Sequence, residues 1–384
     1  MPWVPRISGR VVNMGRASPR GLSADHNVLS AGTATVPEFE LWQPTGRRKL
    51  QIEHPYLMFL GDAADQLAAK TAQGIVHWRR DWCVGQLRLD DCNANLGLPE
   101  MTIAEAAAAG VRTLVIGVAN RGGVISESWI ETILAAIGAG MDVASGLHAR
   151  ITDIPGVADA AAANGGQLFD VRHPTETFEV GSGVRRPGKR LLAVGTDCSV
   201  GKMYTALAID AELTGRGVDC DFRATGQTGI FIAGSGVSVD AVVSDFISGA
   251  TEWLAPANAP DHWDLVEGQG SLFHPSYAGV TMGLVHGAQP DALVLCHEPT
   301  RTHMRGLPHQ ALPEVSACIE GHLAAARLTN PDARCVGIAV NTSGMDGDDT
   351  RVALLGELSD RFAMPALDPV REGVGAIADA LERI

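Results

Sequence analysis

A strand-like run followed by a glycine-bounded loop and a lysine constrains this chain more than any other feature. The apolar residues 191–194 lead into the loop 195–201, which has a glycine at each end, and Lys202 then opens a helical pattern. In such an arrangement, main-chain N–H groups and a helix N-terminus enclose a phosphate while the lysine adds a positive charge. The segment therefore predicts a phosphate-binding P-loop within an α/β sheet.

This loop departs from the common P-loop form in two ways. It is one residue longer than G-x-x-x-x-G-K-[ST], and Met203 stands where a Ser or Thr would hold Mg²⁺. A thioether is a poor ligand for a cation that prefers oxygen, and Thr205 should face another side of the helix. We therefore expect the loop to bind phosphates without transferring them and without a metal ion. The predicted cofactor-binding residues are Gly195, Thr196, Asp197, Cys198, Ser199, Val200, Gly201 and Lys202, with Asn341 at the end of a later strand as a contact to a base.

Apolar runs alternate with helical patterns on both sides of the loop. This alternation predicts an α/β fold, in which a Rossmann-like domain with a parallel sheet precedes a P-loop NTPase-like α/β domain. We expect a flexible extension at 1–48, the first domain at 49–172, a Pro- and Gly-rich linker at 173–189 and the second domain at 190–384.

The expected elements follow from the same patterns. In the first domain the strands are 56–60, 82–87, 113–119, 141–144 and 167–171, and the helices are 63–73, 102–109, 126–139 and 156–164. In the second domain the strands are 191–194, 218–223, 263–266, 292–296 and 335–340, and the helices are 202–214, 239–254, 280–286, 314–328, 350–362 and a last one from 373.

Composition excludes several classes of partner and leaves a small-molecule substrate. The formal net charge is −14, and no basic run is dense enough to follow nucleic acid. No apolar stretch approaches the roughly 20 residues that span a bilayer. The seven cysteines are scattered, which indicates free thiols in the cytoplasm. Residues 1–48 lack the apolar core of a signal peptide, so a flexible extension or an upstream start codon accounts for them. Whether the chain forms a homo-oligomer is left open.

Polar segments after two predicted strands supply candidate substrate contacts. Ligands of parallel α/β sheets bind at the carboxyl ends of the strands, and the run RATGQTGI (223–230) lies at such an end. Arginine binds carboxylates or phosphates bidentately, and threonine and glutamine side chains can orient a ligand. A tight turn is the alternative for 223–230. The predicted substrate-binding residues are Arg223, Thr225, Gln227, Thr228, Arg301 and Arg305.

Two residues are predicted to act in proton transfer. Glu267 follows a strand beside glycines, where it can be a general base, a metal ligand or a partner for Lys202. His274 titrates near neutrality and is the second catalytic candidate, with a structural role as its alternative. A nucleophilic role for Cys198 is not expected, because no histidine lies beside it in the sequence.

Six motifs together resemble one family over about residues 50–384: GDAADQLAAKTAQGI (61–75), GVANRGG (117–123), GTDCSVGKMYTAL (195–207), RATGQTGI (223–230), EGQGSLFHPS (267–276) and HEPTRTHMRG (297–306). They resemble the two-domain P-loop family of D-glutamate N-acetyltransferases of bacterial D-amino-acid catabolism. The resemblance implies acetyl-CoA as the co-substrate and an N-acetyl-D-amino acid as the product. Coenzyme A carries a pyrophosphate that a P-loop can hold without breaking it.

Two other functions remain open. The GTD-x-x-VGK loop and the EG-x-G turn are also similar to dethiobiotin synthetase, an ATP- and Mg²⁺-dependent ligase, although Met203 replaces the threonine found there. The third alternative is a non-catalytic nucleotide-binding protein. Binding of coenzyme A without metal favours acyl transfer, and a strict need for Mg²⁺ and ATP favours the ligase.

Overall fold

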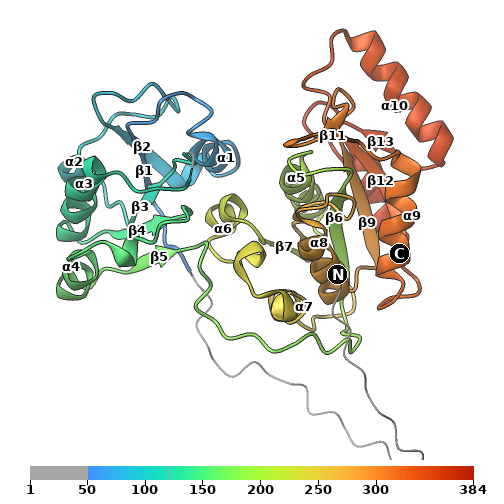
Figure 1. Cartoon of the computed structure of the whole chain (residues 1–384), viewed down its shortest axis with the longest axis horizontal. Coiled ribbons are helices and arrows are strands. Elements are labelled where there is room, and N and C mark those ends of the chain that lie inside the picture. Colours follow the sequence, from blue (N-terminus) through green and yellow to red (C-terminus); the bar gives the residue numbers. More distant parts are fainter. Residues whose placement is uncertain (1–50, 121) are drawn as a thin grey trace, which may run out of the picture. The chain divides into compact units, whose positions relative to one another are not determined.

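The computed structural model of the chain describes residues 51–120 and 122–384. The extension predicted at 1–48 lies outside these residues. Within the described ranges, no helix has both the length and the apolar character needed to cross a bilayer. The described residues form two parallel sheets, each with its own helices, and a small antiparallel hairpin (Figure 1). The predicted α/β class is confirmed.

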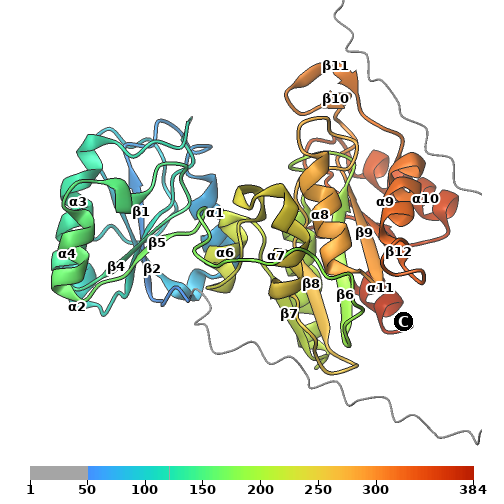
Figure 2. The same cartoon turned by 60° about the horizontal axis from the view of Figure 1, so that its bottom comes forward.

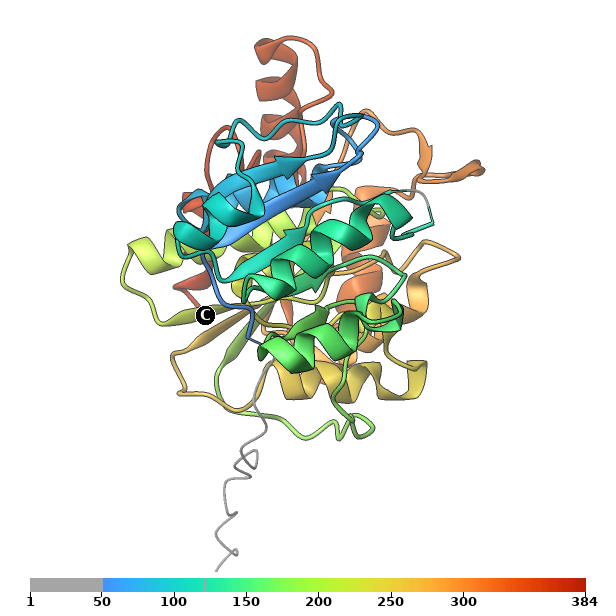
Figure 3. The same cartoon turned by 90° about the vertical axis from the view of Figure 1, so that its left-hand side faces the viewer.

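The first sheet has five strands in the order β2–β1–β3–β4–β5, and all neighbouring strands are parallel. Helices α2, α3 and α4 lie on one face, which is turned toward the viewer in Figure 3, and α1 lies on the other. The strands are β1 (Tyr56–Gly61), β2 (Cys83–Arg88), β3 (Thr113–Ile116), β4 (Asp142–Ser145) and β5 (Leu168–Asp170), and the helices are α1 (Lys70–Trp78), α2 (Ile103–Ala108), α3 (Glu127–Gly138) and α4 (Val157–Asn164).

The second sheet has six strands in the order β13–β12–β9–β6–β8–β7, again all parallel. Helices α7, α8 and α9 pack on one face and α5 and α11 on the other (Figure 2). The strands are β6 (Lys189–Gly195), β7 (Cys220–Arg223), β8 (Trp263–Val266), β9 (Ala292–His297), β12 (Arg334–Val340) and β13 (Ala366–Leu367). The helices are α5 (Lys202–Gly215), α6 (Gln227–Ala233), α7 (Ile247–Leu254), α8 (Ala278–Ala288), α9 (Val315–Ala326), α10 (Asp348–Phe362) and α11 (Gly375–Leu381).

The strand β6 lies inside the second sheet, and this explains its uninterrupted apolar sequence. Leu192 and Val194 belong to the core on the α8 side, whereas Leu191 and Ala193 belong to the core on the α5 side. Strands covered on both faces need apolar residues at every position. Strands β8 and β7 lie on one side of β6, and β9, β12 and β13 lie on the other. The carboxyl end of β6 is therefore a switch point of the kind where α/β proteins bind ligands.

Two expected helices differ in their bounds, and several elements were not predicted. The helix expected at 63–73 begins only at Lys70 and continues past Gly74. Gly74 does not end this helix but lets α1 approach α6, because a Cβ on Gly74 would lie 2.9 Å from Thr228 Cγ2. The helix expected at 239–254 is limited to α7, preceded by two short 3₁₀ turns. Helix α6, strand β13 and the hairpin of β10 (His303–Met304) and β11 (Leu307–Ala311) were not predicted.

Candidate functional site

The predicted P-loop joins β6 to α5 and lies at the switch point of the second sheet. Glycine is required at its start, because a Cβ on Gly195 would lie 2.7 Å from Val200 Cγ2. Gly201, directly before α5, has a φ of 103°, a left-handed conformation that favours glycine. Ser199 adopts a φ of 55° within the loop. The loop is thus held in a tight turn whose end leads into the helix N-terminus.

Lys202 is buried at the first position of α5. Its Nζ donates a hydrogen bond to the main-chain oxygen of Asp197, 2.9 Å away. Burial lowers the pKa of Lys202, and the neighbouring acidic groups Cys296, Cys198, Asp197 and Glu267 oppose this shift. The ammonium group is therefore held inside the curve of the loop, where a bound phosphate would give it a stronger partner than a carbonyl oxygen.

The buried carboxylate of Asp197 fastens the P-loop to the segment after β9. It accepts hydrogen bonds from the main-chain N–H groups of Cys198 and Arg305, each at 2.7 Å, and from Arg301 Nη1 at 2.6 Å. Arg301 also donates to the main-chain oxygen of Cys198 at 2.7 Å, and its Nε binds Glu298 at 2.9 Å. The exposed guanidinium of Arg305 contacts the Ser199 hydroxyl. The structure thus brings both predicted arginines to the P-loop, with Arg301 bound to the loop itself.

Glu267 follows β8 and lies beside the P-loop lysine. Its Oε2 accepts the main-chain N–H groups of Thr225 at 2.9 Å and Gly226 at 3.1 Å, and its Oε1 accepts Gln269 Nε2 at 3.2 Å. Burial raises the pKa of Glu267 to about 7, although these hydrogen bonds and Lys202 act in the opposite direction. Glu267 therefore changes protonation state in the range where a general base works best.

Glycines let the segments around Glu267 pack closely. A Cβ on Gly268 would lie 1.6 Å from the main-chain oxygen of Ala193 and 3.0 Å from Lys202 Cδ. A Cβ on Gly229 would lie 2.3 Å from Glu267 Oε2. These contacts place β6, the turn after β8 and the start of α6 around one carboxylate. Gln269 was not predicted as a partner of Glu267, although Gln269 stands two residues later in the same glycine-rich motif.

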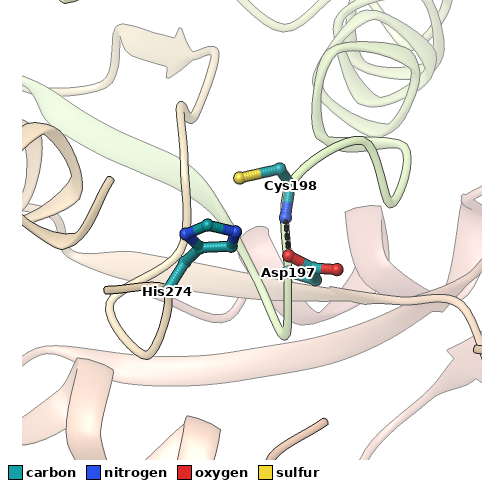
Figure 4. A group of neighbouring side chains, drawn as sticks. All are labelled: Asp197, Cys198 and His274. Atoms are coloured by element: carbon teal, nitrogen blue, oxygen red, sulfur yellow. Dashed lines mark hydrogen bonds between the residues drawn. The ribbon is translucent and has the colours of Figure 1, made fainter. Parts of the chain in front are cut away.

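His274 lies beside the P-loop, but both of its ring nitrogens already have partners. Nδ1 accepts the main-chain N–H of Ser276 at 3.2 Å, so Nε2 carries the proton and donates to the main-chain oxygen of Arg305 at 3.1 Å. Ligand atoms of Asp197, Cys198 and His274 lie within 4.8 Å of one another (Figure 4). The carboxylate of Asp197 and the imidazole of His274 are each engaged in hydrogen bonds within the protein. Burial also raises the pKa of the Cys198 thiol.

Of the remaining predicted residues, some lie at this site and others contact the first sheet and its helix α1. Thr225 binds the main-chain oxygen of Glu267 through its hydroxyl at 2.6 Å. Asn341 follows β12 at the same edge of the sheet, and its main-chain N–H donates to His297 O at 2.8 Å. Gln227 and Thr228, at the start of α6, instead pack against Gly146 and Gly74 of the first sheet and its helix α1. Gln227 Oε1 is buried and has no hydrogen-bond partner within the described residues.

Arg223 is directed away from the P-loop. Its Nε pairs with buried Asp264 at 2.6 Å and its Nη2 with Asp221 at 2.9 Å. Both carboxylates belong to earlier positions of β7 and β8. Because the guanidinium of Arg223 is paired with two carboxylates of the protein, the structure does not favour its predicted contact with substrate.

Met203 occupies the position of the missing Mg²⁺-binding hydroxyl and has a packing role. Its side chain packs against the core that includes the first sheet, and its Cε lies 3.9 Å from where a Cβ on Gly74 would stand. The ring of the next residue, Tyr204, lies tilted against His77 and edge-on to Trp78 of α1. Thr205 faces inward: its hydroxyl binds Gly201 O at 3.0 Å and accepts Cys296 Sγ. Neither Met203 nor Thr205 offers an oxygen to a cation at the loop.

The fold and the loop define a two-domain α/β protein with a Rossmann-like and a P-loop domain. Domain families described as "Domain of unknown function (DUF1611_N) Rossmann-like domain" and "Domain of unknown function (DUF1611_C) P-loop domain" match residues 86–174 and 179–378. The chain belongs to this DUF1611 family. A crystal structure of a DUF1611 family protein from Anabaena variabilis is similar, with a TM-score of 0.76 and 29% identity, covering 86% of this chain and 100% of that one.

Two curated relatives are each named D-glutamate N-acetyltransferase. The protein from Tritonibacter scottomollicae is 58% identical over 333 residues, which cover 87% of this chain and 100% of the relative. The protein from a Pseudoalteromonas species is 49% identical over 328 residues, which cover 85% of this chain and 98% of the relative. The family resemblance stated from the six motifs is confirmed, as is the pairing of a Rossmann-like with a P-loop domain. The domain boundaries and the roles of individual residues stay predictions.

Proposed function

We propose that this protein transfers an acetyl group from acetyl-CoA to the amine of D-glutamate and that the P-loop holds the phosphates of coenzyme A. The two relatives named D-glutamate N-acetyltransferase support the reaction, because they match over almost their entire length. The site geometry supports the place of the donor. A buried lysine, a helix N-terminus and a glycine-rich turn form a phosphate site at the edge of the sheet.

The observation that carries this proposal is the packing of Met203. A P-loop that splits ATP needs a hydroxyl for Mg²⁺ at this position. Here the side chain is a thioether engaged in an apolar contact with α1. Coenzyme A remains intact during acetyl transfer apart from its thioester, so its pyrophosphate needs a site that binds it and no metal that activates it.

We assign the proton transfer to Glu267. The ammonium group of D-glutamate gives a proton to the Glu267 carboxylate, and the freed amine nitrogen attacks the carbonyl carbon of the thioester. The new C–N bond forms as the C–S bond breaks, and coenzyme A leaves as its thiolate. The nitrogen then loses its second proton to become the amide, and the thiolate takes up that proton. Glu267 is preferred to His274 because its pKa lies near neutrality, whereas both nitrogens of His274 are already hydrogen-bonded. Arg305, with its exposed guanidinium, is the candidate for a substrate carboxylate.

The test combines binding and turnover. Thermal stability is measured with coenzyme A in EDTA, with ATP and Mg²⁺, and with ATP in EDTA. We expect stabilisation by coenzyme A in EDTA. Release of coenzyme A thiol is then measured with D- and L-amino acids, and we expect the fastest release with D-glutamate. Product formation that consumes ATP stoichiometrically and ignores acetyl-CoA would instead identify a ligase.

A further inference from the structure

A second group of charged side chains lies at the other end of the P-loop sheet, where β7 and β8 begin. Asp219 directly precedes β7 and His262 directly precedes β8, and Asp221 and Asp264 are paired neighbours within these strands. Parallel strands place their amino ends together, so this group is on the opposite edge from the P-loop. It is not part of the proposed acetyl-transfer site.

The imidazole of His262 is buried and held in one orientation. Its Nδ1 lies 2.9 Å from Asp219 Oδ2, so Nδ1 carries the proton that this carboxylate accepts. The other ring nitrogen, Nε2, lies 3.4 Å from Asp264 Oδ1 and 3.8 Å from Asp221 Oδ2. His262 is only 6% exposed, and its Nε2 has no hydrogen-bond partner among the described residues. A buried nitrogen therefore points at two carboxylate oxygens without a bond to either.

A cation at His262 Nε2 would satisfy this arrangement, in which the buried nitrogen has no hydrogen-bond partner among the described residues. In the neutral ring the Nε2 lone pair would face two anionic oxygens, which is repulsive. A proton on Nε2 gives only a poor contact, because neither oxygen lies in hydrogen-bonding geometry. A tetrahedral cation fits better, because two ligands bonded at ~2.1 Å lie roughly 3.4 Å apart. That separation matches the distance from Nε2 to Asp264 Oδ1.

The carboxylates of this group have arginine neighbours, but none of these arginines bonds to His262 Nε2. Arg223 pairs directly with Asp221 and Asp264, and the charges of Arg186 and Arg190 act on Asp264 from farther away. Arg223 binds the same oxygens that face His262, at 2.6 and 2.9 Å, and Asn258 Nδ2 lies 3.3 Å from Asp264 Oδ1. A carboxylate oxygen has more than one lone pair, so these bonds do not prevent metal coordination. The side chains of Asp219 and Asp221 are exposed, which gives a cation a path to the group.

We infer that His262, Asp264 and Asp221 bind a divalent cation of the zinc type, with Asp219 as the positioning residue that orients the imidazole. One imidazole and two carboxylates form a donor set that suits Zn²⁺. A carboxylate on the far ring nitrogen is the usual partner of a metal-binding histidine. Such an ion would join the starts of β7 and β8 at the outer part of the sheet and stabilise the fold without taking part in acetyl transfer.

The test measures metal binding by the full-length protein after dialysis against EDTA. Zn²⁺ is added at neutral pH, the bound metal is determined by mass spectrometry, and thermal stability is recorded. We expect about one Zn²⁺ per chain and a higher Tm in its presence. His262→Gln should abolish both effects, and Asp219→Asn should weaken binding by about tenfold. Asp221→Asn, at an exposed position, replaces His262→Gln if that variant does not fold.

The matched control is His286→Gln on α8, since His286 Nε2 also has no hydrogen-bond partner within the described residues. This variant should bind Zn²⁺ like the parent protein. Equal binding by the parent and by His262→Gln would overturn the inference. So would a parent protein whose Tm is unaffected by Zn²⁺ but rises on acidification in a manner that His262→Gln removes, because the positive charge would then be a proton.

Discussion

Lys202 Nζ lies 2.9 Å from the main-chain oxygen of Asp197, so the P-loop lysine is bonded to its own loop. The side chain of the same Asp197 is bonded to Arg301 on the segment after β9. One residue thus connects the phosphate-binding lysine with the arginine segment. This connection leads to separate expectations for the lysine, for the neighbouring Glu267 and for the arginine.

Replacing the lysine should weaken binding of the acetyl donor. Lys202→Met removes the charge but keeps much of the side-chain volume, and the loss of a charge-assisted hydrogen bond to phosphate is worth about 1.5–3 kcal/mol. We expect the KM for acetyl-CoA to rise by about 10- to 100-fold. The control is Lys189→Met at the start of β6. An unchanged KM for acetyl-CoA of Lys202→Met in steady-state kinetics would show that the P-loop does not bind the donor.

The pH dependence of the rate should follow Glu267. As a general base it works only when deprotonated, so kcat/KM should fall below its pKa of about 7 and level off above it. Glu267→Gln should lower kcat by about 10²–10⁴-fold and remove this dependence. The measurement is a pH–rate profile of both proteins, with His274→Gln as the comparison. A parent profile that stays level from pH 6 to pH 8 would exclude Glu267 as the base.

The same pKa shift has a consequence for stability. The pKa of Glu267 in the folded state is raised above its ordinary value, so the folded protein holds this proton more tightly than the unfolded chain. Its contribution to stability is fully present below the ordinary carboxyl pKa and is lost as pH rises through about 7. Glu267→Gln should therefore gain stability relative to the parent protein between pH 5 and pH 8 in denaturant unfolding. An equal difference at both pH values would contradict this expectation.

Sequence patterns predicted the elements whose burial is uniform. The strand β6 and its loop were found because both faces of β6 are buried, which gives a continuous apolar run ending at Gly195. Helix α6 was missed because Gly226 precedes it, Gly229 lies inside it and its first residues are polar, features typical of a turn. Tertiary packing explains the glycine inside the helix, because a side chain at position 229 would collide with Glu267. The helix depends on a neighbour that is remote in sequence.

The candidate site was predictable in its residue types but not in its pairings. The polar residues after β6, β8 and β9 meet because the carboxyl ends of parallel strands share one edge. Arg223 also ends a strand, yet its partner is Asp264, two positions earlier in register on β8. Alternation along β7 places Asp221 and Arg223 on one face, but the pairing of this face with Asp264 depends on which strand lies beside it. The neighbourhood of His274 and Cys198 was likewise not predictable, because folding brings together two segments that are distant in the sequence.

Replacing Arg301 should loosen the P-loop. Asp197 is fully buried, so Arg301→Met leaves a carboxylate without its charged partner, at a cost in unfolding free energy of about 3 kcal/mol. The KM for acetyl-CoA should rise as well. In the double variant Asp197→Asn/Arg301→Met the loss should be smaller than the sum of the single losses, because the uncompensated charge is gone. Strictly additive losses in denaturant unfolding would show that the two side chains do not act as a pair.

Restoring a hydroxyl after the P-loop lysine should not create a metal requirement. Met203→Thr removes an apolar side chain from its contact with α1, so we expect a loss in unfolding free energy of about 1–2 kcal/mol, below that of a fully buried methionine. If the loop only holds coenzyme A, the KM for acetyl-CoA should be the same in Mg²⁺ and in EDTA for both the variant and the parent protein. Met203→Leu, which keeps the apolar contact, is the control for stability. The relevant measurements are acetyl-transfer kinetics and ATP hydrolysis under both conditions. Appearance of Mg²⁺-dependent ATP hydrolysis in Met203→Thr would mean that this one side chain separates a carrier-binding loop from one that breaks phosphate bonds.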